Sequence, residues 1–589
     1  MKVILFGIGA VGVILFERLY LAGADIICIL DNDPQKAGTS HYGTPILPPT
    51  ALKGMKLKGV SILICTEREG CYEEICAQLQ TLGLRENIDF CDGTKRFAPL
   101  NSMGLVSSCA QDLERKSAPF FEAEAASGGP ETDDASDSPA GPAASGVLIH
   151  KSHAPDERII EMPGAKRIFR VYSGQKAGIM ADVFKRLSES SLLGSFLPGM
   201  KKTRPLWQEA PPCLLFEMNY LEPVSYAPEW PPAMFKDYVL WMLDFMAGLD
   251  KAGLAVDRPH PHKSTFAGGG FLFTDPGALR VRPMNSQDFL YFANSHIMPL
   301  ILMTKRRHDR ACQYLKNPAA PCVFADVRGH LDADEAAAWL DLQTQCGLLP
   351  AVGRAGDMCA RLADYVRPMD FNFALEIWRG YHQKAFESSS MNEKLHNVLA
   401  LAGQSGARSI IDLAGNTGWY ALALCAKADY VVSVDYENGP SDDAYRLIRA
   451  QGVKNVVPLC FNLLSPLPAY LNDLALDPSG GVRPERRAAQ KRLRCDLALA
   501  LAVIHHLAFS QRLDFTEIID LLRQWTRRWL IVEYIDADDQ HLPQQRADDF
   551  AWYTRENFEK ALLKHFKIAA VRPSNSPTRS LYLCELGKR

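Results

Sequence analysis

Three features that would assign the chain to a class of protein at once are missing from its sequence. No two of the 15 cysteines form a Cys-x-x-Cys pair, so we expect no zinc site and no disulfide framework, and the thiols suit a reducing cytoplasm. The net charge of −3 gives no reason to expect nucleic acid as a partner. No apolar run is long enough to span a bilayer. These absences predict a soluble cytoplasmic protein without a metal site or a membrane partner.

The N-terminus begins with Met1-Lys2 and an apolar run over residues 3–16, which could be taken for a signal peptide. No small-residue cleavage site follows cleanly, because Glu17 and Arg18 come at once. The same residues fit the opening of a nucleotide-binding fold better, and this is the interpretation that we adopt.

A strand, a glycine-rich loop and a helix are predicted in order at this N-terminus. The apolar residues 3–6 precede the loop, a helix follows to about Leu21, and a second strand over 25–30 ends at an acid. This context is typical of a dinucleotide-binding Rossmann unit, whose ligand would contact Gly7, Gly9, Gly12 and Asp31. Residues 31–46 resemble small Rossmann domains attached to sugar-modifying enzymes. The resemblance implies a nucleotide, NAD(P) or a nucleotide-sugar as ligand, and a domain that serves only for docking is the alternative.

The composition changes twice before the middle of the chain. Residues 123–146 contain no aromatic residue and no Leu, Ile or Val, so they cannot bury apolar surface and we predict a disordered acidic linker.

Further on, Asp257, His260 and Asp275 resemble the catalytic pattern of kinase-like phosphotransferases. Lys263 stands where that pattern has a metal-binding Asn, and no glycine-rich phosphate loop precedes it. We therefore expect no active kinase, but a module that binds acceptor or only packs against its neighbour, and we interpret Asp257, His260 and Asp275 as structural turn residues. His260 and His262 lack a third metal ligand nearby, so we interpret them as loop residues.

A second strand, loop and helix are predicted around residue 415. An apolar run over 409–413 contains Asp412, small residues follow to Gly418, and an amphipathic segment covers 419–427. The next apolar strand, 430–434, ends at Asp435. An acid at the tip of the second strand is placed to accept hydrogen bonds from a ribose diol. A Rossmann unit that binds a dinucleotide would give the same pattern.

These residues resemble motif I of the class I S-adenosylmethionine (SAM)-dependent methyltransferases, which runs acid-x-Gly-x-Gly-x-Gly. Ala414 and Asn416 replace the first two glycines, and Asn is tolerated in left-handed conformations. Later segments resemble the rest of the family in order. They are the buried strand 495–507 of motif IV with its active-site residues at the carboxyl end, the strand 529–534, a helix opening at 553–558 with Thr554 as N-cap, and a closing antiparallel hairpin of 567–571 and 580–586.

The resemblance implies SAM as cofactor and a set of site residues. The methionine end of SAM would be held by Asp412, Ala414, Gly415, Asn416 and Gly418. The ribose would be held by Asp435, and the adenine would contact Tyr436 and Asn462. Candidates for catalysis at the neighbouring strand ends are His505, His506 and Glu533, with Tyr553 as a further acceptor contact. The histidines could instead only hold the loop.

We predict an α/β multidomain protein with two Rossmann-like doubly wound sheets on either side of an α+β middle module. Trp378, Tyr381 and His382 share one face of a predicted helix, as core residues or as a lid of the cofactor site. The predicted ranges are 1–100 (nucleotide-binding), 101–157 (linker), 158–317 (kinase-like), 318–400 (helical connector) and 401–589 (methyltransferase). The function that we predict is methyl transfer to O or N of a small molecule or glycan-type acceptor. The alternatives are a nucleotide-sugar-modifying enzyme or a noncatalytic SAM-binding scaffold.

Overall fold

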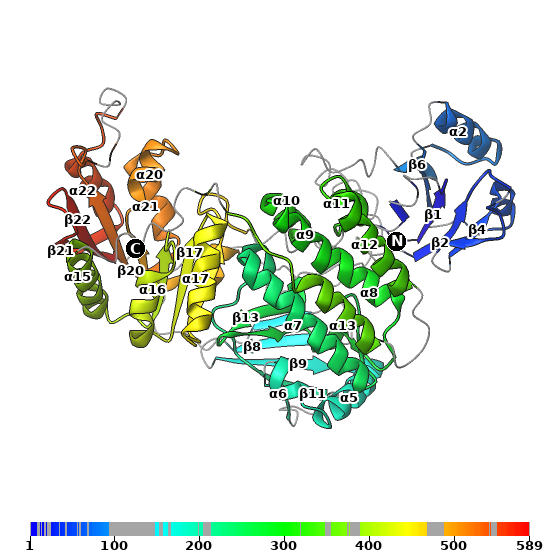
Figure 1. The fold of residues 1–589 in the computed structure, drawn as a ribbon, viewed down its shortest axis with the longest axis horizontal. Helices are drawn as coiled ribbons and strands as arrows, with labels where there is room; N and C mark the ends of the chain where they lie inside the picture. Colours follow the sequence, from blue (N-terminus) through cyan, green and yellow to red (C-terminus); the bar gives the residue numbers. More distant parts are fainter. Residues whose placement is uncertain are drawn as a thin grey trace, which may run out of the picture. The chain divides into compact units, whose positions relative to one another are not determined.

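The computed structural model (Figure 1) describes residues 2–93, 148–347, 355–376 and 389–587, with gaps inside these ranges of which 204–213 and 468–487 are the longest. The described residues form two compact units. The first is built mainly on residues 2–92, and the second holds the described chain from residue 148 on, apart from 317–329. No described helix has the length and apolar character needed to reach across a membrane. The predicted linker up to residue 147, and Trp378, Tyr381 and His382, lie outside the described residues.

The first unit is organised on a mainly parallel six-stranded sheet of order β3-β4-β2-β1-β5-β6. Its central strands are β1 (Lys2–Phe6), β2 (Asp25–Leu30) and β5 (Val60–Ile64), and α2 (Cys71–Thr81) follows β5. The outer strands are β3 (Ser40–His41), β4 (Thr44–Leu47) and β6 (Phe90–Asp92), of which only β3 is antiparallel to its neighbour. The apolar residues of β1 are fully buried, as a parallel sheet covered on both faces requires. The predicted strands and their order along the chain are confirmed.

The second unit begins with a five-stranded antiparallel sheet of order β10-β11-β9-β8-β7. The strands are β7 (Leu148–Lys151), β8 (Glu157–Met162), β9 (Arg167–Tyr172), β10 (Lys201–Thr203) and β11 (Leu214–Asn219), with α5 (Gly174–Ser188) after the third. Strand β7 lies inside the segment that we predicted as linker. This part of the prediction is corrected, because the backbone of β7 pairs with β8 from Leu148↔Glu161 to Lys151↔Arg158.

Helices and two small hairpins follow this sheet. The long helix α7 (Pro232–Lys251) precedes two antiparallel pairs of strands: β12 (Ala255–Val256) with β15 (Leu279–Arg280), and between them in the chain the hairpin of β13 (Ser264–Ala267) with β14 (Gly270–Phe273). Helix α8 (Ser286–Phe292) follows them. The helices of the predicted connector 318–400 pack on different partners. Helix α12 (Ala333–Gly347) contacts α8 and α13 (Ala355–Val366) packs on α7, whereas α15 (Ser389–Ser405) covers the C-terminal sheet. The amphipathic stripe predicts that a helix is buried, but not which partner covers it.

The C-terminal part contains a seven-stranded sheet of order β18-β17-β16-β19-β20-β22-β21. The first five strands are parallel, and they are β16 (Ser409–Leu413), β17 (Tyr430–Asp435), β18 (Val456–Cys460), β19 (Cys495–Ala500) and β20 (Thr526–Ile535). The hairpin β21 (Phe566–Pro573) and β22 (Arg579–Leu586) closes the sheet with β22 antiparallel to β20. The predicted closing hairpin is confirmed, and the strand order reverses at β16, as is typical of a doubly wound sheet.

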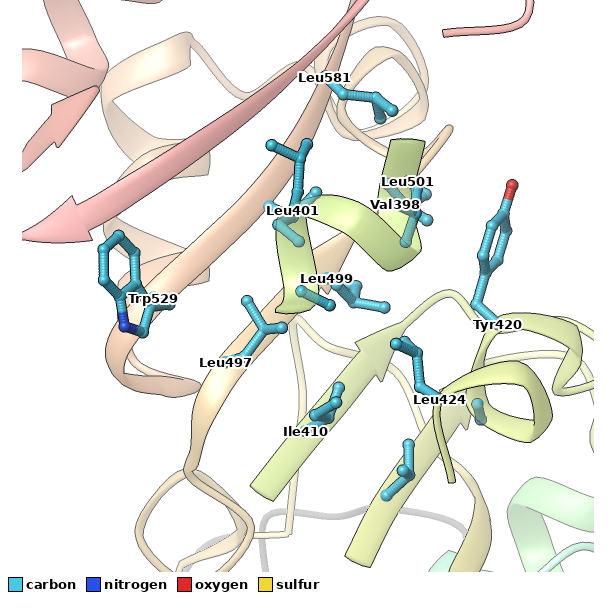
Figure 2. Close-up of a cluster of buried hydrophobic side chains, with 14 of the residues drawn as sticks. Val398, Leu401, Ile410, Tyr420, Leu424, Leu497, Leu499, Leu501, Trp529 and Leu581 are labelled. Carbon is cyan, nitrogen blue, oxygen red and sulfur yellow. The ribbon is translucent and has the colours of Figure 1, made fainter. Parts of the chain in front are cut away.

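Helix α15 (Ser389–Ser405) covers one face of this sheet. Figure 2 shows its Val398 and Leu401 gathered with side chains of β16, β19 and β22, including Ile410, Leu497, Leu499 and Leu581. All of these side chains are at most 2% exposed. Truncation of one such leucine to alanine would lower the free energy of unfolding by about 2–5 kcal/mol. This core therefore stabilises the strands whose ends carry the site.

Candidate active site

The loop after β16 adopts left-handed backbone conformations, although only one of the three residues concerned is a glycine. Ala414, Asn416 and Gly418 have φ of 69°, 48° and 74°, so all three are left-handed. These are the three positions at which motif I has glycine. Between them, a Cβ on Gly415 would lie 2.3 Å from Ser433 Oγ and 3.0 Å from Asp412 Oδ2. The loop therefore passes closely over the ends of β16 and β17. Its left-handed residues are those that the sequence aligns with the three glycines of motif I.

Asp435, at the tip of β17, holds this loop in place. Its Oδ2 accepts the backbone N–H of Asn416 at 2.9 Å, and its Oδ1 accepts that of Glu437 at 3.0 Å. Burial raises the pKa of Asp435 to about 6, although the backbone hydrogen bonds oppose the rise. Each carboxylate oxygen can accept a second hydrogen bond, so the predicted contact with a ribose diol is compatible with this geometry.

Asp412 brings a second carboxyl to the same loop. It is 1% exposed, and its Oδ2 has no hydrogen-bond partner among the described residues. Burial, and next the charge of Asp435, raise the pKa of Asp412 to about 7, and the ammonium of Lys394 opposes this. A buried carboxylate oxygen without a partner is costly unless a ligand supplies one. A cationic ligand such as SAM, with its ammonium and sulfonium groups, fits this requirement.

The two predicted adenine contacts are placed differently. Tyr436 is 59% exposed next to Asp435, so its ring has room to pack on a ligand. The side-chain oxygen of Asn462 accepts the backbone N–H of Leu464 at 2.9 Å and closes a turn after β18. Asn462 thus has a local structural role, and its contact with adenine stays a prediction.

His505 and His506 lie on α20 (Ile504–Phe509), which follows β19, with their ring centroids 4.0 Å apart. Burial, and next the neighbouring His506, lower the pKa of His505 to about 3, and burial lowers the pKa of His506 as well. Both rings are therefore neutral at physiological pH. Nδ1 of His505 has no hydrogen-bond partner among the described residues. The predicted strand over 495–507 is too long, because β19 ends at Ala500 and both histidines lie on the helix that follows it. Their catalytic role stays a prediction.

Glu533 is placed as a structural anion and not as a catalytic base. It is fully buried, and its Oε2 accepts hydrogen bonds from Lys394 Nζ at 2.7 Å and from Ala502 N at 2.8 Å. The hydroxyl of Ser574 donates to its other oxygen. Burial opposes ionisation, but Lys394 and these hydrogen bonds outweigh it and hold the pKa of Glu533 below its ordinary value. A carboxylate with all these partners is poorly placed to accept a further proton.

Sequence reasoning missed Lys394, which lies on α15 and is 3% exposed. One signal could have found it: Lys394, Val398 and Leu401 have the i, i+4, i+7 spacing of a buried helix face. A lysine in such a stripe requires a buried anion, but the sequence does not show which of the acids supplies it.

A second buried ion pair, also missed, lies beyond the end of β20. Arg579 donates to both oxygens of Asp539, at 2.8 and 2.9 Å, and Thr578 donates to Asp539 Oδ2 at 2.6 Å. The predicted acceptor contact Tyr553 is 2% exposed, and its ring centroid lies 4.6 Å from that of Phe509 on α20. The hydroxyl of Tyr553 has no hydrogen-bond partner among the described residues. Tyr553 and α20 are thereby brought together at the same edge of the sheet.

In the N-terminal unit, Asp31 is tied to the glycine loop in the same way as Asp435. Its Oδ2 accepts the backbone N–H of Ile8 at 3.0 Å and the ammonium of Lys36 at 3.1 Å. Burial opposes ionisation, but the hydrogen bonds and Lys36 lower the pKa of Asp31. Gly7 has φ of 101°, and a Cβ on Gly12 would lie 2.0 Å from Gly7 O. Both glycines are required by the backbone, whereas Gly9 lies outside the described residues.

The residues of the kinase-like pattern form a buried charge cluster. Lys263 Nζ donates to the backbone oxygen of Asp257 at 2.7 Å and lies 3.9 Å from Asp275 Oδ2. Arg170 lies 3.7 Å from the other oxygen of Asp275 and pairs with Glu157 at 2.8 Å. We interpreted Asp275 as a turn residue, but its carboxylate joins an ionic network between strand β9 and the turn after β14. His260 does act as a loop residue, since its Nδ1 accepts the backbone N–H of His262 at 3.2 Å.

The chain resembles several known proteins. No protein-family model matches it. The nodulation protein NoeA of Rhizobium meliloti (strain 1021) is 24% identical over 395 residues, which cover 62% of this chain and 80% of that protein. Among solved structures, a SAM-dependent methyltransferase from Aquifex aeolicus is 14% identical and covers 36% of this chain and 100% of its own, with a TM-score of 0.25. N-methyltransferase NodS from Bradyrhizobium japonicum WM9, solved with S-adenosylhomocysteine, is 12% identical, covers 35% and 91%, and has a TM-score of 0.26. These structural neighbours are SAM-dependent methyltransferases, and each corresponds to about a third of the chain.

Proposed function

We propose that residues 401–589 form a SAM-dependent methyltransferase that acts on an oxygen or nitrogen of a small-molecule or glycan-type acceptor. One observation carries the proposal: the loop is left-handed at the three glycine positions of motif I and passes over a buried carboxylate oxygen of Asp412 that has no partner in the described part of the chain. This arrangement is adapted to a cationic nucleoside and not to the diphosphate of a dinucleotide, which Asp412 would repel.

The residues around the loop would divide the cofactor between them. Asp412, Gly415 and the loop backbone would hold the methionine end, Asp435 the ribose, and Tyr436 the adenine. SAM would supply a methyl group activated by its attachment to a sulfonium. The chain's own contribution would be to align the acceptor and to exclude water, which accounts for much of the rate of such a displacement.

Calorimetry with SAM and S-adenosylhomocysteine tests this proposal. We expect Asp435→Asn to weaken both affinities at least tenfold, because the loop loses its clamp and the ribose its charged acceptor. Asp429→Asn is the matched control, since Asp429 is exposed, lies before the first residue of the same strand and pairs with the exposed Arg408. If neither ligand binds the wild-type protein, or if both variants behave alike, the proposal is wrong. Binding without methylation of any acceptor would favour the noncatalytic scaffold.

A nucleotide, NAD(P) or nucleotide-sugar site in the N-terminal unit is the second candidate, and the contacts of Gly7, Gly12 and Asp31 favour it. Mass spectrometry of ligands that co-purify with the protein would identify such a ligand and would report on SAM in the same measurement. We further propose that the middle module does not transfer phosphoryl groups, because the Lys263 ammonium lies beside Asp275, where a metal would have to bind. The proposed setting is the cytoplasm, without a nucleic-acid or membrane partner.

A further inference from the structure

The acceptor side of the proposed site contains two buried ion pairs, and in each pair the two charges compensate each other. Lys394 and Glu533 are 4% and 0% exposed in their side chains, and Arg579 and Asp539 are 8% and 1% exposed. Glu533 also accepts hydrogen bonds from Ala502 and Ser574, and Asp539 accepts one from Thr578. An acceptor with a carboxylate, phosphate or ammonium group could gain a partner here only by breaking one of these pairs. Such a break leaves an uncompensated buried charge, which is strongly unfavourable.

Two neutral polar groups remain available to an acceptor beside these pairs. Nδ1 of His505 and the hydroxyl of Tyr553 have no hydrogen-bond partner among the described residues. Phe509 lies one helical turn after His505 on α20 and contacts the ring of Tyr553 at 4.6 Å between centroids. A neutral imidazole nitrogen can accept one hydrogen bond, and a phenol can donate one. Together they match a hydroxyl group, which both donates and accepts.

Aromatic rings surround Tyr553, and two of them, Phe509 and Trp552, are half-buried. Phe550 packs on Phe509 at 4.8 Å between ring centroids, and Trp552 lies 5.9 Å from Tyr553. These rings add apolar surface to a site whose charges are already compensated. A compound with an apolar face and uncharged hydroxyl groups, as a sugar ring has, satisfies both properties.

We propose that the methyl acceptor is an uncharged, sugar-type compound, and that the hydroxyl which is methylated is held between His505 and Tyr553. This inference rests on the proposed methyltransferase function. As the acceptor oxygen bonds to the methyl carbon, the bond from that carbon to sulfur breaks and its electron pair stays on sulfur. The hydroxyl proton passes to the imidazole of His505 and then to water, because the buried ring does not keep a positive charge.

The chemical class of the acceptor can be tested before the acceptor is identified. Water-soluble small molecules from the source cells are separated by ion exchange into neutral, anionic and cationic pools, and each pool is incubated with the protein and SAM that carries a ¹³C-labelled methyl group. We expect O-methyl resonances in the neutral pool only. Label in a charged pool, label on nitrogen, or no label in any pool while SAM binds would each overturn the inference. Absence of SAM binding would instead refute the methyltransferase function itself.

Tyr553→Phe tests the geometry with a readout that does not depend on turnover. We expect the neutral pool to raise the melting temperature of the wild-type protein in complex with S-adenosylhomocysteine, and this rise to be lost in the variant. The KM for the neutral acceptor should increase about tenfold, while the affinity for S-adenosylhomocysteine stays the same. The variant should fold normally, because the hydroxyl has no hydrogen-bond partner to lose among the residues that the structure describes. Tyr430→Phe, at the amino end of β17, is the matched control and should leave the KM unchanged. An unchanged KM in Tyr553→Phe would overturn the inference.

Discussion

The carboxyl group of Asp412 makes the proposed affinity for SAM depend on pH. Burial, followed by the charge of Asp435, raises the pKa of Asp412 to about 7 in the free protein. A bound cation favours the ionised form, so binding lowers this pKa and releases a proton. The affinity should be highest above pH 7 and should be lost as the pH falls through the raised pKa.

The size of the effect follows from the fraction of Asp412 that is ionised. At pH 6 about one tenth of the groups would be ionised, so the dissociation constant should be about tenfold weaker than at pH 8, which corresponds to roughly 1.4 kcal/mol. Asp435, with a pKa of about 6, titrates next to Asp412 and steepens the decline below pH 6.

Calorimetric titrations with SAM from pH 5.5 to 8, each in two buffers with different ionisation enthalpies, measure both the affinity and the protons released. We expect close to one proton released per SAM at pH 6 and close to none at pH 8. Asp412→Asn is the control, and it should bind weakly with a much flatter dependence on pH.

The same substitution should stabilise the protein without ligand. An acid whose pKa is raised on folding reduces stability at every pH above its unfolded value, and the rise from 3.8 to about 7 corresponds to roughly 4 kcal/mol at most. Asp412→Asn should therefore melt at a higher temperature at pH 8 and lose most of this advantage at pH 4. An affinity that stays constant from pH 5.5 to 7.5, with no difference between buffers, would refute the reasoning.

Two further predictions concern stability. Ala414→Gly should raise the free energy of unfolding by about 1 kcal/mol, because Ala414 is left-handed at φ 69°; a decrease in denaturant melts would mean that the Ala414 methyl group makes a compensating contact. Lys394→Met should lower the free energy of unfolding by about 3–5 kcal/mol because it leaves Glu533 buried without its cation, and Lys394→Met with Glu533→Gln should regain much of the loss. If the double variant is no more stable than the single one, the ion pair is not the cause.

The sequence predicted those parts of the structure that depend on local patterns. Strands of the two parallel sheets were found from apolar runs, and the loop at 414–418 was placed correctly although two of its three glycines are replaced. Contacts between distant segments were not predicted. Lys394 and Glu533 are separated by 139 residues, and each alone has the sequence pattern of an ordinary charged residue. Strand β7 escaped prediction because four residues that border a polar stretch become a strand only through their partner β8.

The two Rossmann-type loops illustrate why a shared sequence pattern does not predict a shared function. Asp31 and Asp435 each accept a backbone N–H from the loop after the first strand and another from two residues further along the chain. Lys36 adds an ammonium to Asp31 and lowers its pKa, whereas burial dominates at Asp435 and raises its pKa. A ligand hydroxyl that approaches Asp31 must therefore compete with a salt bridge, and no salt bridge to Asp435 is present among the described residues. The same clamp thus carries a salt bridge in one sheet, whereas in the other it is more deeply buried and has none among the described residues.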